Sequence, residues 1–350
     1  MRLDELDYDL PPDRIARVPA ARREDARLLV CDRASGAVTH DRVPSLPRRL
    51  SRGDLLVVND VRVVPARLGL RRRTGARVEA LVVHVGENGI VLLAEGRGRL
   101  RAGEALEVED DPRVAIELVE RIGEAWRARA AGVDAAHLLE RVGHVPLPPY
   151  IRAARRRDGL SERELEPLDR ERYQTVFAAG GSAVAAPTAG LHLSESILDE
   201  LDANGIERAA VRLEVGPATF APIRGDDLDG HRMEPERYAI GEEAAAHIEA
   251  ARARGARVVA VGTTVVRTLE SVAARDGVVR AGAGEADLFI RPGHRFRAVD
   301  ALLTNFHLPR STLLGLVCAF AGVDRTLALY RDAVREGYRF YSYGDAMLLL

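Results

Sequence analysis

One stretch, residues 300–322, constrains the fold of this chain more than any other. Residues 301–303 form a short apolar run that predicts a buried strand, and turn-forming polar residues stop it. Ser311 then takes the position of a helix N-cap, and the apolar residues 313–320 predict a helix that is buried on most sides. The polar residues held between the strand end and the helix start are Thr304, Asn305, His307 and Arg310.

This arrangement indicates a ligand site. Open α/β sheets bind ligands in the crevice outside the carboxyl ends of their strands, which is where these four side chains are expected to lie. The competing interpretation is an ordinary strand-to-helix connection whose polar residues only cap the helix, since placement within a fold does not by itself establish function.

The length and composition favour two domains in an α/β protein. The chain has 350 residues, of which 47% are hydrophobic, whereas single cores stop growing near ~250–300 residues. One elaborated domain is the alternative. The net charge of -2 gives no general field for binding polyanions, so any contact with nucleic acid has to come from a local cluster.

The basic residues exclude two classes of site. All 51 of them are arginine. Schiff-base catalysis and the Walker-type phosphate loop both need a lysine amine, so neither is available to this chain.

Cysteine usage and hydrophobicity predict a soluble, cytoplasmic protein without a disulfide framework or a Cys-based zinc site. Two cysteines, Cys31 and Cys318, are too few for a disulfide framework or a Cys-based zinc site. The acidic first residues lack the apolar core of a signal peptide. No run reaches the ~18 apolar residues that a membrane-spanning helix needs, so we expect no membrane contact.

The hydrophobic pattern predicts that a small barrel interrupts the α/β domain. Continuous apolar runs at 54–59 and 257–261 indicate strands that are covered on both faces. From 68 to 144 the pattern changes to short alternating runs separated by turn residues, which is typical of a small β-barrel. We therefore expect an α/β domain formed by 1–67 and 145–350, with 68–144 inserted into it.

Polar residues also follow two other predicted strands. Residues 59–62 could equally be a turn with surface arginines, whereas 262–264 precede a helix whose free N–H groups would attract an anion or a ribose. No G-x-G-x-x-G fingerprint occurs, which disfavours a Rossmann methyltransferase or dehydrogenase. The candidate residues of these segments are Asn59, Asp60, Arg62, Gly262, Thr263, Thr264 and Arg267.

A loop of small residues forms a further candidate. Residues 180–190 carry almost no side-chain bulk, which lets backbone N–H groups approach a ligand closely. Thr188 and Gly190 belong to this loop, and His192 follows it just before a predicted helix. The alternative is that the small residues serve only tight packing of a helix on the sheet.

Basic residues cluster after a proline-stiffened segment. Residues 143–152 are expected to be extended, because their prolines cannot join a central strand. The cluster consists of Arg152, Arg155, Arg156 and Arg157, and residues 71–73 form a second one. Either cluster could meet the phosphates of a nucleic acid, although a solvated charged face is the commoner meaning of such a run.

Several long motifs, taken together, resemble one known family. They read AAPTAGLH at 185–192, GTT at 262–264, TNFHLPRST at 304–312 and YRFYSYGDAM at 338–347, with ND at 59–60 and LPPY at 147–150. In this order and over the whole chain they resemble the S-adenosylmethionine:tRNA ribosyltransferase-isomerase family of queuosine biosynthesis, commonly called the QueA family.

The resemblance implies a fold and a reaction. It implies a mixed-sheet α/β catalytic domain that carries an inserted small β-barrel and acts in the cytoplasm. It also implies that S-adenosylmethionine donates its ribosyl part to 7-aminomethyl-7-deazaguanine at the wobble position of tRNA. Epoxyqueuosine-tRNA then forms, and adenine and methionine leave. We expect S-adenosylmethionine and tRNA as partners, no metal, and a monomer.

Three residues depart from the family pattern. Glu214 and Glu234 stand where the family usually has histidine, and His294 stands where it usually has tyrosine. These changes alter charge and proton affinity, so a relative that binds S-adenosylmethionine but modifies another acceptor is one alternative. A non-catalytic tRNA-binding protein is a second.

The implied chemistry assigns provisional roles to the candidates. His192 and His307 are candidate bases, because an imidazole accepts and returns a proton near neutral pH. Asp60, Asp300 and Asp345 are secondary acid–base candidates. Arg267 or Arg310 would pair bidentately with a carboxylate or a phosphate. Gly190 and 262–264 would line the donor pocket, and Thr304 and Asn305 would orient the ribose or the base.

Overall fold

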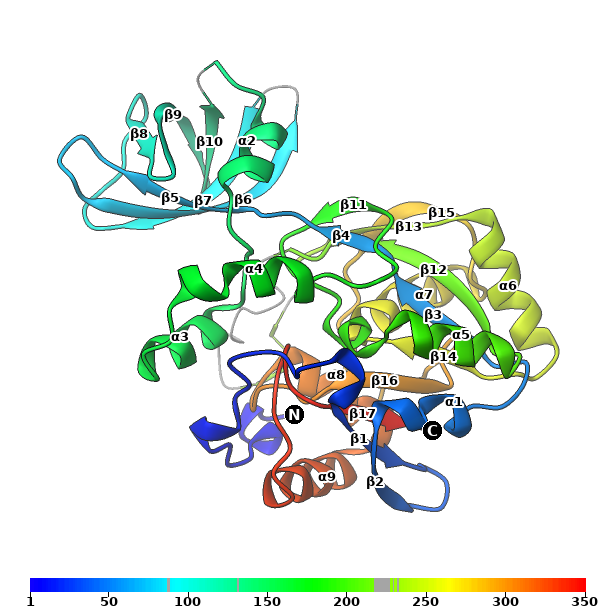
Figure 1. Cartoon of the computed structure of the whole chain (residues 1–350). Coiled ribbons are helices and arrows are strands. Elements are labelled where there is room, and N and C mark those ends of the chain that lie inside the picture. The colour runs from blue at the N-terminus through cyan, green and yellow to red at the C-terminus, as the bar shows by residue number, and fades with distance from the viewer. Residues whose placement is uncertain (87–88, 131, 217–226, 229, 232) are drawn as a thin grey trace.

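The protein is described here from a computed structural model, in which residues 1–86, 89–130, 132–216, 227–228, 230–231 and 233–350 are placed well enough to describe. Figure 1 shows a large α/β body that carries a small β-barrel at one end. The observed architecture confirms the predicted fold class, a mixed α/β protein with a closed barrel.

A mixed sheet of nine strands forms the centre of the α/β body. Its order is β15-β13-β12-β3-β14-β16-β17-β1-β2. The four strands β12, β3, β14 and β16 are parallel neighbours, so their carboxyl ends lie at one edge. The strands are β1 (Arg27–Cys31), β2 (Val38–Arg42), β3 (Leu55–Asn59), β12 (Glu207–Leu213), β13 (Glu236–Ile240), β14 (Val258–Val261), β15 (Gly282–Ala286), β16 (Ala301–Asn305) and β17 (Ala346–Leu349).

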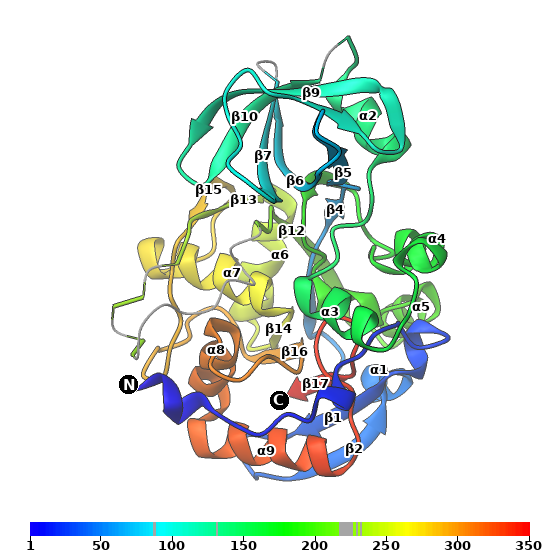
Figure 2. The same cartoon turned by 90° about the vertical axis from the view of Figure 1, so that its left-hand side faces the viewer.

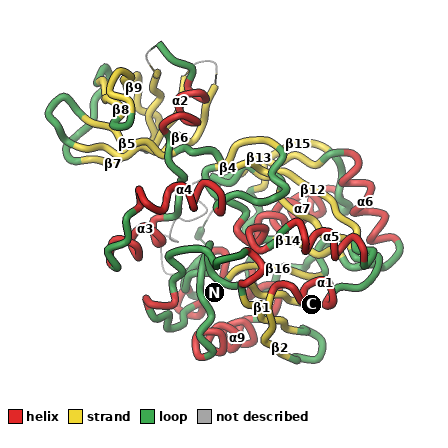
Figure 3. The backbone as a smooth tube through the Cα atoms, viewed as in Figure 1, coloured by secondary structure: helices red, strands yellow, loops and turns green. Residues whose placement is uncertain are grey.

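Helices cover both faces of this sheet (Figure 3). Successive side chains of a strand point to opposite faces, so Leu55 and Val57 join the core beneath α6 to α9, whereas Leu56 and Val58 join the core beneath α1 and α5. The helices are α1 (Leu46–Arg49), α5 (Glu195–Ala203), α6 (Glu242–Ala253), α7 (Thr263–Asp276), α8 (Thr312–Ala321) and α9 (Val323–Arg335). Short 3-10 turns are η1 (Leu3–Leu6), η2 (Pro12–Arg14), η3 (Arg23–Asp25), η4 (Val43–Ser45) and η5 (Thr188–His192).

The barrel closes in the order β10-β7-β6-β5-β8-β9. Its strands alternate buried and exposed residues and fill the interior with aliphatic side chains around Trp126. They are β5 (Arg67–Arg71), β6 (Arg77–Gly86), β7 (Gly89–Gly96), β8 (Ala105–Val108), β9 (Asp111–Ile122) and β10 (Ala125–Ala130), and α2 (Ala135–Val142) follows. The division at 68 and 144 stays a prediction about domain boundaries, since only the position of the strands is observed.

Four further elements lie between the two bodies (Figure 2). Strand β4 (Val61–Val63) pairs in parallel with β11 (Gly180–Ala183) and leads into the barrel. The chain returns through α3 (Pro149–Arg157) and α4 (Glu162–Arg172). Pro149 starts a helix instead of continuing an extended segment, because proline fits the first helical position, where its missing N–H is not needed. The prediction of an extended segment through residue 152 was therefore wrong.

Helix α8 confirms the buried helix expected after Ser311. The Ser311 hydroxyl accepts a hydrogen bond from Leu314 N at 3.2 Å, and most of the helix is buried. Among the described residues no single helix is long and apolar enough to cross a membrane. The bent pair of α8 and α9, which turns by 114° at Gly322, passes that test on length and composition when taken together.

Candidate functional site

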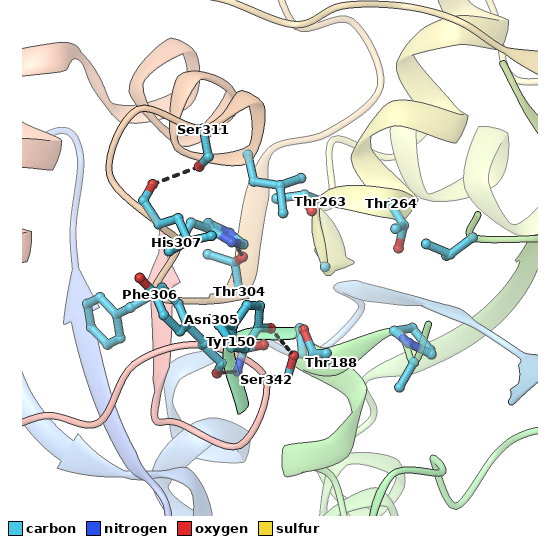
Figure 4. Close-up of a pocket in the computed structure, with 18 of the residues that line it drawn as sticks. Tyr150, Thr188, Thr263, Thr264, Thr304, Asn305, Phe306, His307, Ser311 and Ser342 are labelled. Atoms are coloured by element: carbon cyan, nitrogen blue, oxygen red, sulfur yellow. Dashed lines mark hydrogen bonds between the residues drawn. The ribbon is translucent and has the colours of Figure 1, made fainter. Parts of the chain in front are cut away.

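A cavity of about 340 Å³ lies where the carboxyl ends of β14 and β16 meet. We call it the donor pocket, after the role that the family resemblance predicts for its residues. Its lining comes from five segments, 149–150, 186–189, 262–264, 304–311 and 341–342, together with Val215 and Leu313. Figure 4 shows that the labelled side chains of these segments surround one cavity. Segments far apart in the sequence therefore line a single cavity, and the ligand site expected at 300–322 stays a prediction.

Gly262 makes the turn from β14 into α7. Its φ of 98° lies in the left-handed region that glycine tolerates best. A Cβ there would make ordinary van der Waals contacts, 3.5 Å from Thr264 Oγ1 and 3.6 Å from the Ala189 side chain, so the backbone conformation and not a lack of space selects glycine. The first residues of α7, Thr263 and Thr264, line the pocket, so the N-terminal end of this long helix faces it.

His307 lies in the wall of the pocket. Its Nε2 is 2.9 Å from Thr304 Oγ1, and its backbone N–H donates to the hydroxyl of Tyr330 at 3.1 Å. Burial lowers the pKa of His307 to about 3, because the charged imidazolium would lose its hydration. The imidazole is therefore neutral at pH 7 and oriented by the hydroxyl of Thr304.

His192 lies behind the pocket wall, outside the donor pocket lining. Its Nε2 is 3.1 Å from Asn305 Nδ2, which also donates to the carbonyl of Tyr341 at 3.0 Å. Burial lowers the pKa of His192 to about 4. His192 thus positions the Asn305 amide, while His307 is the histidine that faces the cavity.

Two pocket oxygens are buried without a partner among the residues that the structure describes. They are Thr264 Oγ1 and Asn305 Oδ1. Buried polar atoms in native proteins are nearly always hydrogen-bonded. Because both residues line the donor pocket, a ligand with N–H or O–H groups is the partner that these oxygens are placed to meet.

Two tyrosines form an aromatic wall that the sequence did not assign to the site. The rings of Tyr150 and Tyr341 are 4.6 Å apart between centroids, and the Tyr150 hydroxyl is 2.5 Å from Ser342 Oγ. Tyr341 has a φ of 74°, which is costly for a non-glycine residue and concentrates at functional sites. The motifs at 147–150 and 338–347 were the available signal, but no spacing rule brings them together.

The donor pocket carries little formal charge. Among its described lining residues there is no aspartate or glutamate, and Arg310 is the one arginine. Arg310 also has a positive φ, 58°, and its N–H donates to the carbonyl of Leu6 at 2.9 Å. No group of three or more metal-binding side chains occurs in the described part of the chain. The site therefore offers one cation for an acidic ligand group, with polar and aromatic contacts elsewhere.

Four predicted site residues from the segments at 59–62 and 262–267 lie outside this pocket. The side chain of Asn59 bonds to the backbone of the neighbouring strand β12. Its Nδ2 donates to Leu213 O and its Oδ1 accepts from Leu213 N, each at 3.1 Å. Asp60 pairs with Arg212 through two hydrogen bonds of 2.9 and 2.6 Å. Arg62 is exposed and 3.9 Å from Glu140. These contacts hold the sheet edge together.

Arg267 is the fourth. It is buried and paired with Glu236, and it donates to the carbonyl of Ala286 at 3.1 Å. Gly190 also lies outside the donor pocket lining, because its α-carbon faces the Phe177 ring. An added Cβ would come within 2.7 Å of that ring. Gly190 thus serves tight packing, the alternative that the sequence left open for the small-residue loop.

The secondary acids lie outside the pocket too. Asp300 accepts a hydrogen bond from Val258 N at 2.9 Å, at the end of the parallel strands opposite to the pocket. Asp345 accepts from Arg27 N and Arg339 N at 3.0 and 2.7 Å. Their carboxylates are engaged by backbone N–H groups, which leaves His307 as the predicted base that lines the donor pocket.

The predicted basic cluster is mostly paired within the protein. Arg155 is fully buried, and its two bonds to Asp169 measure 2.6 and 2.8 Å, so it cannot reach a phosphate. Arg152 pairs with Glu79 and Glu162. Arg157 pairs with Asp158 at 2.9 Å. The side chain of Arg156 is 61% exposed, which keeps it available to a partner.

The three departures from the family pattern lie in different surroundings. Glu214 follows β12 and is half-buried, and Glu234 is exposed. His294 is 3.3 Å from the buried carboxylate of Glu270, which also accepts hydrogen bonds from three backbone N–H groups at 297–299. His294 therefore pairs with a loop-organising acid away from the donor pocket. Residues 217–220 of the same motif lie outside the described residues.

The fold and the pocket define an α/β protein with an inserted barrel and a nucleoside-sized site at the carboxyl edge of its sheet. A family model described as "Queuosine biosynthesis protein" matches residues 3–349. The chain belongs to this family, which confirms the resemblance drawn from the motifs.

Named relatives agree with this assignment over their full length. The chain is 51% identical to the S-adenosylmethionine:tRNA ribosyltransferase-isomerase of Anaeromyxobacter sp. (strain Fw109-5), covering 100% of this chain and 99% of the relative. It is 49% identical to the protein of that name from Moorella thermoacetica, with 100% of each covered. The chain also resembles a crystal structure of S-adenosylmethionine tRNA ribosyltransferase from Thermotoga maritima, with a sequence identity of 33% and a TM-score of 0.56. The match covers 99% of this chain and 100% of that one.

Proposed function

We propose that this protein transfers and isomerises the ribosyl moiety of S-adenosylmethionine onto 7-aminomethyl-7-deazaguanine at the wobble position of tRNA. The products are epoxyqueuosine-tRNA, adenine and methionine. The observation that carries the proposal is the donor pocket, because the motifs at 185–192, 262–264 and 304–312 converge on it. The full-length similarity to relatives named for this activity supports the same conclusion.

The lining of the donor pocket suits S-adenosylmethionine. Thr264 Oγ1 and Asn305 Oδ1 are free to accept hydrogen bonds from the adenine amino group or from ribose hydroxyls. Arg310 offers a guanidinium to the methionyl carboxylate. The Tyr150–Tyr341 wall offers aromatic faces to the sulfonium cation, which rings attract through their quadrupoles.

His307 is the proposed base. A proton next to the sulfonium is acidified by the positive sulfur, and a neutral imidazole at the pocket wall can accept it. The Thr304 hydroxyl fixes the ring. His192 does not line the pocket and instead positions the side-chain amide of Asn305, which lies 3.1 Å from its Nε2.

A second candidate function differs in the acceptor molecule that is modified. Glu214 and Glu234 replace the histidines that the family usually has, so a relative with the same donor and a different acceptor is the alternative that an observation favours. tRNA as the partner rests on the names of the relatives. The monomeric state and the cytoplasmic location stay predictions.

One assay tests the proposal. The protein is incubated with S-adenosylmethionine and tRNA that carries 7-aminomethyl-7-deazaguanine, and free adenine is measured by chromatography. We expect adenine only when both substrates are present. Replacing His307→Gln should lower the rate by at least ~10²-fold, the usual scale for lost acid–base help. His247→Gln on α6, away from the pocket, is the control and should be unaffected. Absence of adenine with the wild-type protein would overturn the proposal.

A further inference from the structure

A second cavity, of about 550 Å³, lies at the junction of the barrel and the α/β body. We call it the junction cavity. Its lining comes from β6 and α2 on the barrel side, from β11, and from residues 214–216 and 235–237 beside the ends of β12 and β13. Figure 2 shows the barrel above β12 and β13 at this junction. Nothing described so far assigns this cavity a ligand.

The junction cavity adjoins the donor pocket. Val215 lines both, and it lies between Glu214 and Gly216, which face the junction cavity. The backbone is fixed here, because Glu214 N donates to Arg237 O at 2.9 Å and Gly216 N donates to Glu236 Oε1 at 3.3 Å. A ligand in the junction cavity therefore abuts a ligand in the donor pocket across one side chain.

The walls of the junction cavity suit a planar base. Val64, Val82, Val184 and Val215 present branched aliphatic side chains from four separate segments. Strand β6 changes register between Val82 and His84, and the consecutive residues 82–85 of this strand line the cavity. A volume of this order, with apolar walls beside a set of polar groups, is typical of a small-molecule site.

The half-buried carboxylate of Glu214 adds a negative charge to the junction cavity, and Arg212, the guanidinium that attracts it, is already bonded to Asp60. Its neighbouring carboxylates are neutralised, since Glu236 pairs with the buried Arg267 and Asp60 pairs with Arg212. In the part of the chain that the structure describes, the half-buried carboxylate of Glu214 has no hydrogen-bond or ion-pair partner.

Other ionisable groups also face the junction cavity. They are His84, His137, Glu140, Glu236 and Arg237. Glu140 has only the distant Arg62, at 3.9 Å, and the Arg237 side chain is exposed. Three carboxylates thus face the cavity, whereas Arg237 is the one arginine among its described lining residues, and this excess of negative charge disfavours a phosphate and favours a cationic amine.

We propose that the junction cavity receives the acceptor nucleotide as a flipped-out planar base and that Glu214 binds the primary aminomethyl group of that base. The inference rests on the proposed function, which supplies an acceptor with such an amine. A primary alkylamine is protonated at neutral pH, since its pKa is near ~10. The Glu214 carboxylate can then accept a charge-assisted hydrogen bond from it. The base would stack between the valine walls with its amine toward the donor pocket.

Equilibrium binding tests this inference without requiring turnover. The probes are three anticodon stem-loops whose wobble base is 7-aminomethyl-7-deazaguanine, its N-acetylated form, or guanine. We expect the wild-type protein to prefer the free amine over both other probes by at least ~10-fold, the scale of one hydrogen bond to a charged group. Glu214→Gln should abolish the preference. Glu243→Gln, an exposed glutamate on α6, is the matched control and should keep it.

A second variant tests the location independently of the charge. Ser182→Trp places a large ring in the junction cavity from β11 and should weaken binding of the amine-bearing probe while leaving the affinity for S-adenosylmethionine unchanged. A full preference in Glu214→Gln, or full RNA affinity in Ser182→Trp, would overturn the inference. Adenine release is measured on the same samples. If the wild type releases none, the proposed function fails, and the amine preference still decides whether the cavity binds this base.

Discussion

Thr264 and Thr268 lie one helical turn apart on α7 and differ in what their hydroxyl groups contact. Thr268 Oγ1 donates to the carbonyl of Thr264 at 3.0 Å, within the helix. Thr264 Oγ1 is buried with no hydrogen-bond partner in the described residues and belongs to the donor pocket. One hydroxyl therefore serves the helix, and the other is available to a ligand.

This difference predicts opposite effects of two isosteric substitutions. Thr264→Val should raise the dissociation constant of S-adenosylmethionine ~2–10-fold and leave the free energy of unfolding nearly unchanged, since a hydrogen bond contributes ~0.5–1.5 kcal/mol. Thr268→Val should lower the free energy of unfolding by ~1 kcal/mol and leave the affinity unchanged. Calorimetric titration and urea unfolding measure the two quantities. Equal affinities in all three proteins would show that the Thr264 hydroxyl does not contact the donor.

The two buried histidines make stability depend on pH. Burial lowers the pKa of His307 to about 3 and that of His192 to about 4, whereas an unfolded histidine has a pKa of ~6.5. Below that pH the unfolded state binds protons that the folded state does not. The contribution of each neutral histidine is therefore complete above pH ~6.5 and is lost as the pH falls toward the folded pKa.

We expect His307→Gln and His192→Gln each to flatten this dependence. Between pH 6 and 4.5 each substitution should reduce the slope of unfolding free energy against pH by ~1 kcal/mol per unit, because one full proton difference gives ~1.4. Urea unfolding at a series of pH values measures the slope. Thr268→Val removes no titrating group, so it should lower the curve without changing its slope. Unchanged slopes in both histidine variants would contradict the assignment of neutral, buried imidazoles.

Among the elements, α3 and α4 are joined by one buried ion pair. Arg155 on α3 and Asp169 on α4 are 0% and 1% exposed, and Asp169 also accepts a hydrogen bond from the Tyr343 hydroxyl at 2.9 Å. The side chain of Arg155 additionally donates to the carbonyl of Arg17 at 2.8 Å. The pair thus connects the segment after the barrel to the C-terminal motif that builds the donor pocket.

Removing one partner should therefore destabilise the protein strongly. Arg155→Met should lower the free energy of unfolding by ~3–5 kcal/mol, because it leaves the Asp169 carboxylate buried without its cation. Arg156→Met on the exposed side of the same helix is the control and should change it by less than ~0.5 kcal/mol. Chemical unfolding monitored by circular dichroism measures both. A small effect of Arg155→Met would mean that Arg155 is exposed in solution and available to RNA.

The elements that the sequence predicted well are those with a strong local pattern. Continuous apolar runs predict burial directly, as in the strands β3, β14 and β16 and the helix α8. The alternating runs of the barrel predict half-buried strands. The start of α3 at Pro149 was missed, because proline is compatible both with an extended segment and with a helix start.

Pairings between distant side chains had no local signal. The sequence shows four neighbouring arginines, but not that Arg155 turns inward to Asp169 while Arg156 turns outward. It places His192 and His307 in motifs, but only the fold shows that His307 lines the donor pocket and His192 supports Asn305 from behind. Which face of an element a polar residue occupies is decided by packing that spans the whole chain.

At the scale of the whole molecule, the barrel places arginines far from the α/β core. Arg73, Arg97, Arg99 and Arg101 are exposed, and none forms an ion pair with a described residue. Arg72 holds their two loops together, since its guanidinium donates to the carbonyls of Arg97 and Arg99 at 3.0 and 3.3 Å. The near-neutral chain thus has a local cationic surface on the barrel, which is the kind of surface that polyanion binding requires.

This surface predicts how tRNA affinity depends on salt. If phosphates contact Arg99 and Arg101, each contact releases counterions, so the double substitution Arg99→Gln and Arg101→Gln should weaken binding at low salt. It should also reduce the slope of log affinity against log salt by about two, roughly one per lost phosphate contact. Arg48→Gln with Arg331→Gln removes the same charge from exposed positions on α1 and α9, which lie at the end of the molecule away from the barrel (Figure 2), and should leave the slope unchanged. Fluorescence anisotropy over a salt series measures it. Equal slopes for both double variants would mean that tRNA docks without the barrel arginines, through surfaces such as the exposed side of α3.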